Sequence, residues 1–81
     1  MRVTVIAPDR ALFDGDATSV VAPAYDGLVG ILPGHAPFLT VLGTGALTIP
    51  HGSASSRFTV QGGFLQVVGD TVRVVAEHAD T

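Results

Sequence analysis

The stretch that decides the fold is residues 57–75, RFTVQGGFLQVVGDTVRVV. Polar and apolar residues alternate over 57–61 and again over 71–74 of the strand 71–75, which is the period of a half-buried β-strand. Gly69-Asp70 is a turn between two such strands. Gly62-Gly63 interrupts the strand pattern and indicates either a bulge or a close backbone contact. The stretch therefore predicts antiparallel strands with one face on a core.

The same pattern continues outward from this stretch in both directions. The 10 Gly and 5 Pro residues are spread over all 81 positions and cut the chain into short pieces. We expect about eight to ten strands, with turns every 8–12 residues or so, as in a sandwich or barrel. Asp14-Gly15-Asp16 is either a turn or a bulge in one long strand that runs to Ala22. No linker or repeat divides the sequence, so residues 1–81 are expected to form a single domain.

The alternation also predicts which side chains meet inside the domain. Apolar positions of the first strand and of the deciding stretch should face the core: Val3, Val5, Phe58, Val60, Val72 and Val74. The polar positions between them should face water: Thr4, Arg57, Thr59 and Arg73.

Composition favours a binding protein. Apolar residues make up 47% of the chain and charged residues 14%, against about 25% charged residues in average proteins. No apolar run approaches the roughly 20 residues that span a bilayer, and no signal peptide is expected. A thin core cannot hide so many apolar residues, so some are expected to face a partner, although scattered surface apolar residues are the ordinary alternative.

Charge excludes several partners. The net charge is −3, and the four basic residues are all Arg. Nucleic acids and anionic membrane surfaces attract dense basic patches, which this chain lacks. Without Lys, neither Schiff-base chemistry nor a lipoyl or biotin carrier is possible.

No residue pattern indicates catalysis, a cofactor or a metal. His35, His51 and His78 lie in three separate segments, where a loop, a hairpin tip and a terminus explain them better than a metal site. No nucleophile motif or phosphate loop is present. We therefore expect a non-enzymatic domain without cofactor or metal.

The central segment, residues 25–39, is unusual. It is apolar, Pro33 and Pro37 stiffen it, and its glycines allow tight turns. A stiff apolar loop loses little entropy on binding, which favours a binding surface. A tightly packed core turn explains the same features, and the residues alone do not decide between the two.

Residues 30–39, GILPGHAPFL, resemble the G-x-x-P-G-H-A-P-h-L signature of the epsilon subunit of F-type ATP synthases, called delta in mitochondria. Residues 12–15 (LFDG), 43–49 (GTGALTI) and 62–67 (GGFLQV) are similar to further family segments in the same order. The resemblance covers essentially the whole chain.

The resemblance implies a ten-stranded β-sandwich of two sheets. It further implies a non-catalytic rotor subunit of the central stalk that binds the gamma subunit and rests on the ring of c subunits. Such a subunit couples proton or sodium flow to ATP synthesis. It lies at the cytoplasmic face of the bacterial plasma membrane, peripheral to the membrane through the complex.

The resemblance also implies contact residues. The turn after the first strand supplies Ala7, Asp9 and Arg10, and the segment before the signature supplies Tyr25, Asp26 and Leu28, with His35 and Ala36 close by. Family members often carry an acid at the place of Leu28, so this chain departs from the family there.

Family members usually continue into two C-terminal helices, which can inhibit hydrolysis and in some members bind ATP. Because this sequence stops at Thr81, we expect a naturally short protein without a helical hairpin, an inhibitory arm or bound nucleotide. The alternative to the rotor subunit is a stand-alone β-sandwich adaptor with another protein partner.

Overall fold

The computed structural model describes residues 1–80, and these form eight β-strands and no helix. The strands are β1 (Arg2–Ala7), β2 (Arg10–Asp16), β3 (Val20–Ala24), β4 (Gly27–Ile31), β5 (Phe38–Val41), β6 (Thr44–His51), β7 (Ala54–Val68) and β8 (Thr71–Asp80). The sheet order is β2-β1-β8-β7-β6-β3-β4, and β5 pairs with β7. Among the strand pairs of residues 1–80, β1 with β8 is the parallel one. Within the described chain, no helix could span a membrane.

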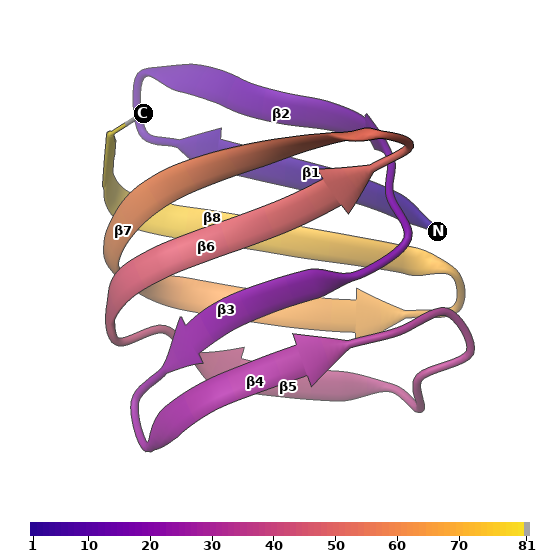
Figure 1. The fold of residues 1–81 in the computed structure, drawn as a ribbon. Coiled ribbons are helices and arrows are strands. Elements are labelled where there is room, and N and C mark those ends of the chain that lie inside the picture. The colour runs from indigo at the N-terminus through magenta and orange to yellow at the C-terminus, as the bar shows by residue number, and fades with distance from the viewer. Residues whose placement is uncertain (81) are drawn as a thin grey trace.

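The sheet folds over into two layers because its longest strand, β7, belongs to both. Residues 54–61 of β7 pair with β6, whereas residues 64–67 pair with β5. In Figure 1, β6, β3 and β4 lie in front, and β8, β5 and the second part of β7 lie behind. The predicted all-β sandwich class is confirmed.

β7 passes from one layer to the other at Gly62-Gly63. Gly63 has a φ of +103° and lies so close to β8 that a Cβ atom there would overlap the carbonyl oxygen of Val75. The same Cβ would come within 2.9 Å of the Cα atom of Ala76. The register of β7 against β8 is the same on both sides of the glycine pair. The pair therefore marks a close backbone contact and not a bulge.

The chain has eight strands in the described residues and not the ten that the resemblance implies. The reason is that β7, with 15 residues, and β8, with 10, continue unbroken through the bend. Asp14-Gly15-Asp16 is neither a turn nor a bulge, since it is the end of β2. The irregularity in β2 lies at Leu12, which has no partner where the register against β1 shifts.

Apolar side chains of both layers fill the space between them. The predicted core residues are all buried, as are Ile31, Leu47, Ile49 and Leu65. Burying one such side chain contributes roughly 1.5–3 kcal/mol. Arg57, Thr59 and Arg73 are exposed as predicted, whereas Thr4 is half-buried. Thr4 lies on an inner strand between Asp14 and Arg73, so its neighbours limit its contact with water.

Candidate functional site

The two turns predicted to bind a partner lie at the same end of the sandwich. The β1–β2 turn and the β3–β4 turn are both at the left end in Figure 1. Most of their side chains are exposed, and Tyr25 and Leu28 expose 72% and 76% of their surface. Ala7 is the exception, because it is buried beneath the turn. The residues brought to this end are Ala7, Asp9, Arg10, Tyr25, Asp26 and Leu28.

The β1–β2 turn carries charge of both signs. The Arg10 guanidinium lies 3.5 Å from the Asp9 carboxylate and donates to the carbonyl oxygen of Ala79, also at 3.5 Å. A hollow of about 330 Å³ lies beside it, lined by the turn and by residues 77–79 of β8. These exposed contacts are weak, so Arg10 can exchange them for a partner at little cost.

The loop between β4 and β5, residues 32–37, lies at the opposite end of the sandwich (Figure 1). His35 is held within it: Nδ1 donates to the Ala36 carbonyl oxygen at 2.7 Å, and the ring packs edge-on against Phe38 with centroids 5.5 Å apart. The backbone N–H of His35 donates to the Leu32 carbonyl oxygen. The structure therefore does not bring His35 and Ala36 to the end that carries the two turns.

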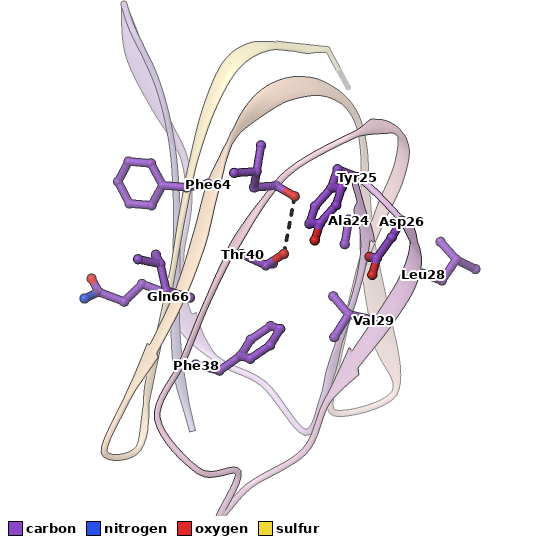
Figure 2. A pocket seen from close by; sticks show the side chains of 11 residues that line it. Ala24, Tyr25, Asp26, Leu28, Val29, Phe38, Thr40, Phe64 and Gln66 are labelled. Atoms are coloured by element: carbon purple, nitrogen blue, oxygen red, sulfur yellow. Dashed lines mark hydrogen bonds between the residues drawn. The ribbon is translucent and has the colours of Figure 1, made fainter.

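An apolar groove of about 960 Å³ runs between β4 and β5. Figure 2 shows Phe38 of β5 and Val29 of β4 facing each other across it, with Tyr25 and Asp26 at one end. Phe38 and Val29 are half-buried and pack against the core. Asp26 is the one charged side chain among the residues that line the groove. The two strands on either side of the groove, β4 and β5, are not paired with each other.

A second apolar surface covers the outside of the rear layer. Val41, Phe64, Val75 and Ile6 are register partners on four neighbouring strands and form one row. Val41 is 58% exposed and Phe64 39% exposed. Leu39 lies beside the row on β5 and is 67% exposed. We call this row with Leu39 the outer apolar face.

Sequence reasoning did not locate the outer apolar face, although a signal for it exists. Phe64-Leu65, Val67-Val68 and Val74-Val75 are adjacent apolar pairs, which break the alternation of a half-buried strand. One member of each pair must face outward. The chain does expose apolar residues, and these pairs mark several of them. That a partner covers them stays a prediction.

The histidines do not form a metal site among residues 1–80, because no group of three His, Cys, Asp or Glu side chains is close enough to hold an ion. His51 Nε2 lies 2.8 Å from the Ser56 hydroxyl, and its ring stacks obliquely on Phe13. This pair joins the two strands of the β6–β7 hairpin.

Comparisons with known proteins agree on one family. A family model described as the β-sandwich domain of the ATP synthase delta/epsilon chain matches residues 1–81. ATP synthase epsilon chains of Leptospira borgpetersenii and Solibacter usitatus are 40% and 44% identical, over 96% and 99% of this chain. The chain spans only 61% and 60% of their lengths. The epsilon chain of Caulobacter vibrioides is 39% identical, and there the chain spans 92% of the relative.

Two solved structures share the fold. One is a chain from the central stalk and c-ring of the Tetrahymena thermophila mitochondrial ATP synthase, with a TM-score of 0.83 and 21% identity, covering 98% of this chain and 64% of that one. The other is a chain of the Euglena gracilis mitochondrial ATP synthase, with a TM-score of 0.88 and 22% identity. The match covers 96% of this chain and 51% of that one.

Proposed function

The chain belongs to the family of ATP synthase delta/epsilon chains, whose β-sandwich domain it contains, and we propose that it works as a non-catalytic rotor subunit of an F-type ATP synthase. In this role it binds the gamma subunit and the ring of c subunits, and so couples proton or sodium flow to ATP synthesis. It sits peripherally at the cytoplasmic face of the bacterial plasma membrane, as part of the complex.

The observation that carries the proposal is the exposure of apolar side chains both at the end with the two turns and on the outer apolar face, on a domain matched over its whole length. Residues of both surfaces line the groove between β4 and β5. A monomer of this size rarely leaves such patches open unless a partner covers them. A rotor subunit that joins a stalk to a ring needs two contact surfaces. The end with the β1–β2 and β3–β4 turns and the outer apolar face meet that need.

We assign the end with the two turns to the ring of c subunits. Tyr25 and Leu28 give it apolar area, and Asp9, Arg10 and Asp26 give it charge. The outer apolar face then meets the gamma subunit. The loop with His35 and Ala36 is at the far end from the turns, so we assign it to the gamma side.

Leu28→Ala tests this assignment. An immobilised wild-type chain should retain both purified gamma subunit and purified c-ring. Leu28→Ala should weaken c-ring binding by about ten-fold, as truncation of a central apolar anchor does. Because Leu28 is 76% exposed, its free energy of unfolding should change by less than about 0.5 kcal/mol.

Leu32→Ala is the matched control, since Leu32 is 64% exposed but lies in the loop at the opposite end. Its affinity for the isolated c-ring should equal that of the wild type. Equal losses for the two variants would contradict the assignment. Retention of neither gamma nor c-ring at micromolar concentration would contradict the proposed function and favour an adaptor with another partner.

A further inference from the structure

The described sheet leaves one side of three strands unpaired: β2, β4 and β5. Free strand edges invite pairing with other chains, and proteins usually protect them with charges, prolines or bulges. β2 is protected, because it carries Arg10, Asp14 and Asp16 and an irregularity at Leu12. β4 (GLVGI) and β5 (FLTV) contain neither charge nor proline, and neither shows a register shift.

The hydrogen-bonding groups on the free edge of β4 follow from its pairing with β3. Pro23 is opposite Leu28, has no N–H, and its carbonyl oxygen accepts from the N–H of Gly43 on the other side of β3. Pro23 and Leu28 therefore form a non-hydrogen-bonded pair. Such pairs alternate with hydrogen-bonded ones, so the N–H and C=O groups of Leu28 and Gly30 point away from β3.

The outward N–H and C=O groups of Leu28 and Gly30 are not covered by side chains. A Cβ atom at Gly30 would have no atom within 4 Å, so no side chain covers the backbone there. Leu28 is largely exposed, and Gly27 also has open space around it. By contrast, the free edge of β5 is already partly used, because the Val41 carbonyl oxygen accepts from the N–H of Tyr25. Of the two unprotected edges, β4 is the more open one.

The groove beside β4 fixes the chemistry of what can lie there. Its floor, Val29 and Phe38, is apolar, and its single charged lining residue is Asp26 at the end near the β3–β4 turn (Figure 2). An extended segment alternates its side chains, so one set can pack on this floor while its backbone pairs with β4. Charge complementarity calls for a basic side chain beside Asp26.

We infer that the free edge of β4 takes up an extended segment of a rotor partner as an added strand, with a basic side chain of that segment beside Asp26. The inference rests on the proposed function for the identity of the partner complex. It adds the mode of contact: backbone hydrogen bonds from Leu28 and Gly30 to a strand that covers the groove.

Amide hydrogen exchange of the chain, free and bound to a gamma–c-ring subassembly, tests the inference. In the free chain, the amides of Leu28 and Gly30 should exchange fast and that of Val29 slowly. In the complex, the Leu28 and Gly30 amides should slow by about 100-fold, as paired strand amides do. A stable complex in which both amides still exchange fast would overturn the added strand and leave the proposed function standing.

Two other outcomes are equally informative. Absence of any complex would refute the proposed function itself. Protection of both amides in the concentrated free chain, without partner, would mean that a second copy pairs at this edge, and would overturn the inference.

Gly30→Pro and Gly30→Ala provide a matched pair of variants. Proline removes only an N–H that points away from β3, whereas alanine keeps that N–H and places its Cβ in open space. Gly30→Pro should weaken binding by about ten-fold, because it removes one interfacial hydrogen bond. Gly30→Ala keeps that hydrogen bond and should weaken binding by less than about two-fold. Equal affinities for the two folded variants would count against strand addition. If Gly30→Pro does not fold, amide exchange of the wild type decides.

Discussion

Replacing Gly63 by alanine should remove most or all of the free energy of unfolding of the chain. The new Cβ would overlap the carbonyl oxygen of Val75 and lie 2.9 Å from the Cα atom of Ala76, and both are backbone atoms that cannot move aside. The φ of +103° adds strain for any residue with a side chain. We expect the free energy of unfolding to fall by at least about 4 kcal/mol, which is in the range of exceptional single substitutions. The total free energy of unfolding of an 81-residue domain is only roughly 4–12 kcal/mol.

Denaturant unfolding followed by circular dichroism measures this effect. Gly30→Ala is the control, because Gly30 lies in a strand of the same domain and the added Cβ atom meets nothing within 4 Å. The free energy of unfolding of Gly30→Ala should lie within about 1 kcal/mol of the wild-type value. A cooperative Gly63→Ala transition near that of the wild type would show that β7 does not cross between the layers at this contact.

Replacing Leu65 by alanine should lower the free energy of unfolding by about 2–5 kcal/mol, the usual decrease when a large apolar side chain in a core is truncated. Leu65 is fully buried on β7 just after the bend, opposite Thr40 of β5 and Val74 of β8. It therefore packs where the rear layer closes on the core. The thin core of a domain this small has little room to relax around the resulting cavity.

The control for Leu65→Ala is Leu39→Ala, on the neighbouring strand but 67% exposed. Thermal unfolding should show a large drop in midpoint for Leu65→Ala and a shift of a few degrees at most for Leu39→Ala. The reverse order would mean that β5 and β7 present their other faces to the core, one residue out of the register described here.

The sequence predicted the strands and the core because most of them alternate. Val3, Val5, Val72 and Val74 are buried, as their spacing requires. The sequence did not predict which side chains face outward where the alternation is broken. Phe64 and Val75 each belong to an adjacent apolar pair, and periodicity alone does not show that these two are the members on the outer face.

The strand number and the position of the signature loop depended on long-range geometry. The Gly62-Gly63 pair indicated either a bulge or a close backbone contact, but the local pattern could not show that β7 continues through the bend as one strand. His35 follows Tyr25 closely in sequence, but the five residues of β4 carry the chain to the other end of the sandwich before His35 is reached. The resemblance implied a position close to the turns, and the structure differs from it.

The central segment, residues 25–39, has two structural roles. Ile31 is fully buried and anchors the end of β4 in the core. Leu28, Leu32 and Leu39 are exposed, each on a different part of the surface. The segment is therefore partly core and partly exposed, and binding by its exposed part stays a prediction.

Ion pumping driven by ATP hydrolysis, in vesicles that contain the host ATP synthase with and without this chain, tests the central claim most directly. Without the chain, the enzyme should hydrolyse ATP but build no ion gradient, because the stalk is not fixed to the ring. Adding the purified chain should restore pumping. Equal pumping with and without the chain would contradict its role as a coupling subunit of the rotor.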